Sequence, residues 1–213
     1  MRQMKIAGIV LAGGASRRMG TDKAALELGN SRVLDIIAGE LSSMTSKVYI
    51  ATGSVSRENM NSEYIEVKDI YEGSGPLAGM LAGMLRGEAD LYVVVSCDIP
   101  LIRAELLSAM VKALELSLDS GIQALVPQIR GQIHPLAAVY HCSIIDVLEA
   151  QLREDNRRVR DALSRFSVRY VTESELELAT GIPAAQIEEM FINMNEKEDY
   201  ERVKQIYESR DVE

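Results

Sequence analysis

An apolar run near the start of the chain, from Ile6 to Leu11, leads into two adjacent glycines, Gly13 and Gly14. Continuous apolar runs of this kind are typical of strands buried on both faces of a parallel sheet. The pattern of residues turns helical after the glycines and the basic residues that follow them. The segment therefore predicts a strand, a tight loop and a helix in succession. The feature therefore favours an α/β domain with a mostly parallel sheet.

The loop after this predicted strand combines glycines with positive charge. Glycine has no Cβ, so Gly13 and Gly14 can turn main-chain N–H groups toward an anion. Arg17, Arg18 and Lys23 follow and bring three cationic side chains to the same loop. This combination predicts a polyphosphate site. The alternative is an ordinary glycine-rich turn with solvated arginines.

Spacing excludes two common phosphate motifs. A P-loop requires GxxxxGK followed by Ser or Thr, whereas Gly20 is followed here by Thr21, Asp22 and Lys23. The dinucleotide fingerprint GxGxxG also fails, because Gly13 and Gly14 are adjacent and no third glycine completes it. The loop therefore belongs to another class of nucleotide site.

Further apolar, β-rich runs alternate with helical patterns along the chain. Strands are expected at 47–51, 64–67, 91–95, 123–126 and 136–140. Helices are expected at 33–41, 77–85 and 101–118. The order predicts a single Rossmann-like domain over 1–213, with a mostly parallel twisted sheet and helices on both faces. We expect 1–100 to bind a nucleotide and 101–213, with its acidic C-terminal helices, to bind an acceptor.

Composition narrows the class of protein. The 213 residues show no linker and no long apolar run or leader, so we expect one cytoplasmic domain and no membrane contact. Cys97 and Cys142 are far apart and predict free thiols rather than a zinc or redox site. The net charge of −9 argues against nucleic-acid binding. Residues 171–213 contain 12 acidic and 4 basic residues, which predicts a solvated helical face.

Two carboxylates follow predicted strands. Asp98 comes just after the run Leu91 to Val95, at the edge where the glycine loop also lies, and is our candidate Mg²⁺ ligand. The alternative is that Asp98 caps a helix starting near Pro100. Asp69 precedes a loop containing Gly75 and Pro76 and could accept hydrogen bonds from a base or ribose. The alternatives are a solvated turn acid for Asp69 and a simple helix start for Pro76.

The second half of the chain offers candidates for an anionic partner. Six arginines fall within 153–169, and Arg157 and Arg158 could bind phosphate or could simply be exposed on a helix. The alternating run 191–195 predicts a short strand with Asn193 and Asn195 on one face. Asn195 could instead cap the final helix. His134 is expected to be a loop residue and not a catalytic base.

These segments together resemble one family. LAGGASRRMGTDKA is similar to the signature loop of the molybdenum cofactor guanylyltransferase family (MobA), within the glycine-rich-loop nucleotidyltransferases that include sugar-nucleotide transferases. Asp69 with GPLAG, Cys-Asp-Ile-Pro, the arginine-rich segment and the Asn-x-Asn end resemble further elements of that family in the same order. Thr52 and Gly53 depart from it, since relatives often present an asparagine there, and 171–190 matches poorly.

The resemblance implies an Mg²⁺-dependent enzyme that transfers GMP from GTP to molybdenum-bearing molybdopterin and releases pyrophosphate. It implies catalytic roles for Arg18, Lys23 and Asp98, with Asp98 as the metal ligand, and acceptor contacts from Arg157, Arg158, Asn193 and Asn195. The nucleotide contacts that it implies are Leu11, Ala12, Gly13, Gly14, Lys23, Asp69, Gly75, Pro76, Leu77 and Asp98.

Two alternatives remain open at the level of sequence. The chain could transfer CMP to molybdopterin, or a nucleotide to another phosphorylated acceptor such as a cobamide precursor or phospholactate. It could also be a noncatalytic nucleotide-binding module whose acidic helices contact a molybdenum enzyme or a cofactor-insertion protein.

Overall fold

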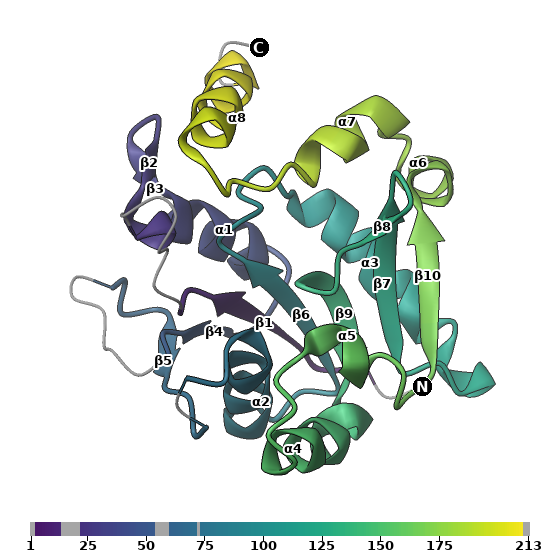
Figure 1. Ribbon diagram of the computed structural model, residues 1–213. Coiled ribbons are helices and arrows are strands. Elements are labelled where there is room, and N and C mark those ends of the chain that lie inside the picture. The colour runs from purple at the N-terminus through teal and green to yellow at the C-terminus, as the bar shows by residue number, and fades with distance from the viewer. Residues whose placement is uncertain (1–2, 14–21, 54–59, 72, 211–213) are drawn as a thin grey trace.

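The computed structural model describes residues 3–13, 22–53, 60–71 and 73–210. They form one α/β domain in which a continuous twisted sheet lies between two layers of helices (Figure 1). This confirms the predicted fold class.

The described residues build a sheet of eight strands in the order β10-β7-β9-β6-β1-β4-β5, with β8 paired to β7. Parallel pairing joins β1 to β4 and β6, β4 to β5, and β7 to β10. The strand β9 runs antiparallel between β6 and β7, and β8 is antiparallel to β7. The strands are β1 (Ile6–Leu11), β4 (Val48–Ala51), β5 (Ile65–Val67), β6 (Leu91–Ser96), β7 (Ala124–Ile129), β8 (Gln132–Ile133), β9 (Ala137–His141) and β10 (Val168–Thr172). A separate hairpin pairs β2 (Glu27–Leu28) with β3 (Ser31–Arg32).

Helices cover both faces of the sheet. One face carries α1 (Val33–Ser42), α3 (Ala104–Glu115), α6 (Glu173–Thr180), α7 (Ala184–Met190) and α8 (Lys197–Arg210). The other face carries α2 (Pro76–Arg86), α4 (Ile145–Arg153) and the short α5 (Val159–Ala162). Short 3-10 helices are η1 (Lys23–Ala25), η2 (Leu118–Ser120) and η3 (Cys142–Ile144).

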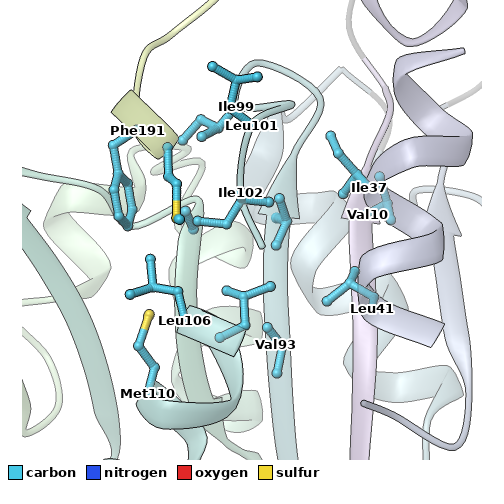
Figure 2. Close-up of a cluster of buried hydrophobic side chains, with 14 of the residues drawn as sticks. Val10, Ile37, Leu41, Val93, Ile99, Leu101, Ile102, Leu106, Met110 and Phe191 are labelled. Atoms are coloured by element: carbon cyan, nitrogen blue, oxygen red, sulfur yellow. The ribbon is translucent and has the colours of Figure 1, made fainter. Parts of the chain in front are cut away.

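Side chains of β1 alternate between the two cores, as a strand with two covered faces requires. Val10 packs into the core beneath α1 and α3, whereas Ile9 and Leu11 pack beneath α2. Figure 2 shows part of the first core, where Ile37 and Leu41 of α1 pack near Val10. Burying each such side chain contributes about 1.5–3 kcal/mol, so these layers hold the strand ends in fixed positions.

The strands predicted at 47–51, 64–67, 91–95, 123–126 and 136–140 and the helices predicted at 33–41 and 77–85 agree with the structure. Three other predictions differ from it, and one of these is the helix considered for Arg157 and Arg158, which precede α5. The helix expected at 101–118 is shorter, because Leu101 and Ile102 are buried in the core before α3 begins at Ala104. The strand expected at 191–195 is wrong, since this segment crosses the end of the sheet as a loop. Its buried residues, Phe191 and Met194, are three apart, a spacing that does not fit the alternation of a strand.

The acidic C-terminal region forms helices, as predicted. Among the described residues, no helix is long and apolar enough to cross a membrane. Cys97 is buried and Cys142 is partly buried, and neither forms a disulfide within the described residues.

Candidate active site

Four parallel strands end at the same edge of the sheet. The strands β1, β4, β5 and β6 lie side by side and point the same way, so the residues that follow them meet at that edge. Ligands in open α/β sheets bind beyond such carboxyl ends. Lys23, Asp69 and Asp98 each follow one of these strands.

Lys23, Asp98 and Asn195 come together from distant parts of the chain. The Lys23 Nζ donates to Asp98 Oδ1 at 2.7 Å and to Asn195 Oδ1 at 2.9 Å. The Lys23 side chain is 14% exposed and that of Asp98 is 35% exposed. Two oxygens from different loops therefore converge on one cation at the sheet edge. The cluster therefore brings together three candidate residues that the sequence analysis predicted on three separate segments.

Lys23 is held by local structure at the start of η1. The carboxylate of Asp22 caps this turn by accepting from the N–H of Ala24 at 3.1 Å. The side chain of the next residue, Ala24, is buried against the core, so the turn is fixed on one side. Lys23 is thereby directed toward the end of β6.

Asp98 lies in the tight turn after β6 and does not cap a helix. Its main-chain N–H donates to Ser96 Oγ at 3.3 Å, and the Ile99 N–H donates to the Ser96 carbonyl at 3.1 Å. The helix α3 begins only at Ala104, whose N–H donates to the carboxylate of Glu40 in α1. The capping alternative for Asp98 is therefore wrong.

Asn195 reaches the cluster because its loop is tied to the same turn. The Met194 N–H donates to the Asp98 carbonyl at 2.8 Å, and the Met194 side chain is fully buried. Asn193 and Asn195 are both exposed on either side of this anchor. The helix α8 begins at Lys197, and the Asn195 amide oxygen accepts from Lys23, so Asn195 does not cap α8.

The cluster fits a divalent cation in its donor chemistry. Mg²⁺ prefers carboxylate and amide oxygens and is commonly held by one or two carboxylates together with substrate phosphates. Asp98 and Asn195 already direct one oxygen each at the Lys23 ammonium. In the described part of the chain, no group of three or more His, Cys, Asp or Glu side chains could hold a metal alone. Phosphate oxygens would therefore have to complete the site.

Asp69 is an unusual carboxylate beside the first turn of α2. Its Oδ1 atom is buried without a hydrogen-bond partner, and burial raises the pKa of the carboxyl. A Cβ on Gly79 would lie 3.6 Å from that oxygen, which places the carboxylate against the start of α2. Buried polar atoms are normally paired, and an unpaired carboxylate oxygen is a candidate ligand contact.

The loop before α2 ends in a backbone conformation that favours glycine. Gly75 has φ 68° and ψ −157°, a conformation available almost only to glycine, and Pro76 then starts the helix. The first N–H groups of a helix lack partners within it and can face a ligand. The side chain of Leu77 is fully buried, so only its backbone could contribute to a site.

The loops after β1 and β4 touch through their backbones. A Cβ on Gly13 would come within 2.8 Å of the Gly53 main-chain nitrogen, so glycine is required there by close approach. The Ala12 N–H donates to the Ala51 carbonyl at 2.9 Å, and the Cys97 N–H donates to the Leu11 carbonyl at 3.2 Å. The unusual Thr52-Gly53 pair thus forms the neighbour of the glycine loop. Thr52 is buried and its hydroxyl donates to Glu66.

Arg157 and Arg158 lie in a loop before α5 and not on a helix. The guanidinium of Arg157 pairs with Asp155 at 2.8 Å and donates to the Gly73 carbonyl at 3.2 Å. This contact brings the arginine-rich segment to the loop that precedes α2. The Arg158 side chain is exposed, while its backbone carbonyl accepts from the buried Gln151 amide.

Other candidate residues have plainer surroundings or are not described. The ring of His134 packs against that of Phe191 in a tilted arrangement with centroids 4.9 Å apart. Burial, together with the positive charge of the nearby Arg160, lowers the pKa of His134. Gly14, Arg17 and Arg18 lie outside the described residues. Asp199 was not among the candidate residues predicted from the sequence. Its carboxylate accepts hydrogen bonds from the N–H groups of Asn195 and Glu196. Its position in the first turn of a helix was the available signal.

Known proteins of one family resemble this chain over most of its length. Residues 8–173 match the family model described as MobA-like NTP transferase domain. A relative from Bacillus subtilis (strain 168), named probable molybdenum cofactor guanylyltransferase, is 36% identical over 199 residues, covering 92% of this chain and 94% of the relative. A relative of the same name from Peptoclostridium acidaminophilum is 33% identical over 202 residues, covering 93% of this chain and 88% of the relative.

A solved structure also has this fold. Molybdopterin-guanine dinucleotide biosynthesis protein A from Archaeoglobus fulgidus superposes with a TM-score of 0.79 at 24% identity, covering 95% of this chain and 99% of that one. The family match spans most of the chain, including β5 and β6, which precede Asp69 and Asp98. The chain therefore belongs to the family of MobA-like NTP transferases.

Proposed function

We propose that the chain transfers GMP from GTP to molybdenum-bearing molybdopterin, forming the guanine dinucleotide cofactor and releasing pyrophosphate. The observation that carries the proposal is the convergence of Lys23, Asp98 and Asn195. It places a cation from the glycine loop, a carboxylate from the end of β6 and an amide from the C-terminal half at one point. A transfer between two phosphorylated substrates needs such a meeting point. The names of the relatives support the same reaction.

The reaction requires positioning and charge neutralisation. The terminal phosphate of the acceptor attacks the α-phosphorus of GTP, a new P–O bond forms, and the bond to the β-phosphate oxygen breaks to release pyrophosphate. A phosphate monoester with its second pKa near neutrality is already a sufficient nucleophile, so no covalent intermediate on the enzyme is needed. Lys23 neutralises charge on the α-phosphate in the transition state.

We assign Mg²⁺ to Asp98, with Asn195 as a neighbouring oxygen donor. When bound, the ion would neutralise phosphate charge and orient the reacting oxygens. In this structure the Lys23 ammonium contacts the Oδ1 atoms of Asp98 and Asn195. With the ion bound, this ammonium would instead contact a phosphate oxygen of the nucleotide. Arg18 is proposed to hold the β- and γ-phosphates together with main-chain N–H groups of Gly13 and Gly14.

The two halves of the chain have different proposed tasks. Residues 1–100 would hold GTP, with Asp69 accepting the guanine N1–H and N2–H groups, which its buried unpaired oxygen is suited to do. Gly75, Pro76 and the backbone of Leu77 would line the same pocket. Residues 101–213 would hold the pterin, with Arg157 and Arg158 on its phosphate and Asn193 and Asn195 near the reacting end.

We also place the reaction in the cytoplasm and expect transient contacts with molybdenum enzymes or cofactor-insertion proteins. The acidic helices α6 and α8 are the proposed contact surface. Support for α6 comes from Leu178, which is 88% exposed on a helix whose first turn carries Glu173 and Glu175.

Pyrophosphate release tests the proposed reaction. Purified protein is mixed with Mg²⁺, molybdenum-bearing molybdopterin and each of GTP, CTP, ATP and UTP in turn. We expect selective turnover of GTP, because Asp69 can pair with the guanine N1–H and N2–H groups and cytosine lacks the N1–H. Turnover of CTP would overturn the base assignment. Absence of turnover with every nucleotide would overturn the proposed acceptor.

A further inference from the structure

We infer that Asp199 is a positioning residue, which sets Asn195 at the reaction centre and thereby fixes where the acceptor binds relative to Lys23 and Asp98. The inference rests on the proposed function for its consequence in catalysis. The contacts that carry it are independent of that function.

One carboxylate oxygen of Asp199 organises the segment that contains Asn195. The Asp199 Oδ2 atom accepts from the Asn195 N–H at 3.0 Å and from the Glu196 N–H at 2.9 Å. Hydrogen bonds from two main-chain donors to one carboxylate are charge-assisted and fix the backbone conformation. The side chain of Asn195 then leaves this backbone toward Lys23, where its Oδ1 accepts at 2.9 Å.

The helix that carries Asp199 is itself anchored beside the nucleotide loop. The Tyr200 hydroxyl donates to the Glu27 carbonyl at 2.7 Å, and Glu27 lies in β2, just after the η1 turn of Lys23. Val203 on α8 is fully buried in the core. Figure 1 shows α8 beside the β2–β3 hairpin. Asp199 and Tyr200 are consecutive residues of α8. Asp199 therefore holds Asn195 while Tyr200 holds the segment that follows Lys23.

The loop is tied down on its other side as well. The Met194 N–H donates to the Asp98 carbonyl at 2.8 Å, so consecutive N–H groups of Met194 and Asn195 are held by Asp98 and Asp199. Asn195 is exposed and stands in a loop, where a side chain would otherwise sample several rotamers. Removal of the Asp199 carboxylate would release Asn195 on one side and leave the Met194 bond intact. Loss of geometry at a reaction centre lowers the rate even when both substrates still bind.

The test compares Asp199→Ala, Asp199→Asn and the control Glu198→Gln. Glu198 is exposed in the same first turn of α8, so its neutral variant removes a charge at the same helix end without touching Asn195. Asn at position 199 keeps an oxygen that can accept from the two N–H groups. For each variant, pyrophosphate release at varied molybdopterin, the Kd for GTP with Mg²⁺, and NMR amide exchange at Asn195 and Glu196 are measured.

We expect Asp199→Ala to lower kcat/KM for molybdopterin at least about tenfold, with the Kd for GTP changed less than about threefold. Amide exchange at Asn195 and Glu196 should rise about tenfold, while Asp199→Asn recovers most of both losses and Glu198→Gln resembles wild type. If Asp199→Ala fails to fold, Asp199→Ser replaces it, with a loss of the same kind expected because the shorter, uncharged side chain no longer accepts from both the Asn195 and the Glu196 N–H groups.

Equal kinetics for Asp199→Ala and Glu198→Gln would overturn the inference, as would an equal loss of GTP affinity and acceptor turnover. If wild type releases no pyrophosphate with any nucleotide, the proposed function fails. Amide exchange then decides the inference separately, because unchanged exchange at Asn195 in Asp199→Ala would overturn the positioning role without any turnover.

Discussion

The Nζ atom of Lys23 lies 2.7 Å from Oδ1 of Asp98, joining the segment after β1 to the turn after β6. The two strands are parallel neighbours in the centre of the sheet, so their ends are held in register by the ladder from Ile6 opposite Leu91 to Leu11 opposite Ser96. The sheet therefore holds the end of β6, and with it the turn that carries Asp98, beside the end of β1.

Replacing Asp98 with Asn should abolish most turnover while leaving the fold intact. The side chain keeps its size but loses the charge that would hold Mg²⁺, and we expect kcat/KM to fall about 10²–10³-fold. Pyrophosphate release at saturating GTP measures the loss. Asp119→Asn is the matched control, because Asp119 is exposed in η2 beyond the far end of α3. A normal rate in Asp98→Asn would remove Asp98 from the site.

Lys23→Met should separate stability from activity. Partly exposed ion pairs contribute about 0–1 kcal/mol, so urea unfolding should show a change of no more than about 1 kcal/mol. Nucleotide turnover should fall about 10²-fold or more, because the side chain supplies charge to the phosphates. A large loss of stability with an unchanged rate would mean that Lys23 is structural.

Gly13→Ala should destabilise the protein because the added Cβ would clash with the backbone of Gly53, and not because the backbone at residue 13 loses conformational freedom. A Cβ would meet the Gly53 nitrogen at 2.8 Å, and backbone on both sides cannot easily give way. We expect a loss of about 1–3 kcal/mol in unfolding free energy. Gly39→Ala is the control, since Gly39 lies inside α1 with no atom within 4 Å of its added Cβ, and it should stabilise by about 0.5–1 kcal/mol. Equal effects of the two variants would contradict the close approach.

Asp69→Asn should raise stability at neutral pH and lower activity. Burial raises the pKa of the Asp69 carboxyl in the folded protein, so folding is favoured when it is protonated and this contribution is lost as pH rises through the folded pKa. The neutral variant avoids that loss. Thermal unfolding should show a higher Tm than wild type at pH 7, with the difference shrinking toward pH 4. A Tm advantage that is constant with pH would exclude the carboxyl as its cause.

Much of this arrangement could be predicted from local sequence patterns. The apolar run Ile6 to Leu11 and the carboxylate after β6 were enough to place Lys23 and Asp98 at one sheet edge, because parallel strands share that edge. The antiparallel β9 could not be predicted, since its run of apolar residues has the same composition in either direction. Strand direction depends on which neighbours it pairs with.

The position of Asn195 shows a different limit. Alternation in 191–195 predicted a strand, but the burial of Phe191 and Met194 and the bond from Met194 to Asp98 set the backbone there. Those contacts join residues almost a hundred positions apart, which no local period contains. The role inferred for Asp199 follows from the same long-range packing.

The measurement that tests the central claim most directly is the fate of GTP labelled at the α-phosphorus, incubated with Mg²⁺ and molybdopterin in the presence of wild type or Asp98→Asn. If Lys23, Asp98 and Asn195 form a nucleotidyl-transfer centre, the label moves into the pterin product with wild type, and the Asp98 variant leaves it in GTP. Label that accumulates in GDP or GMP with no pterin product would contradict the claim.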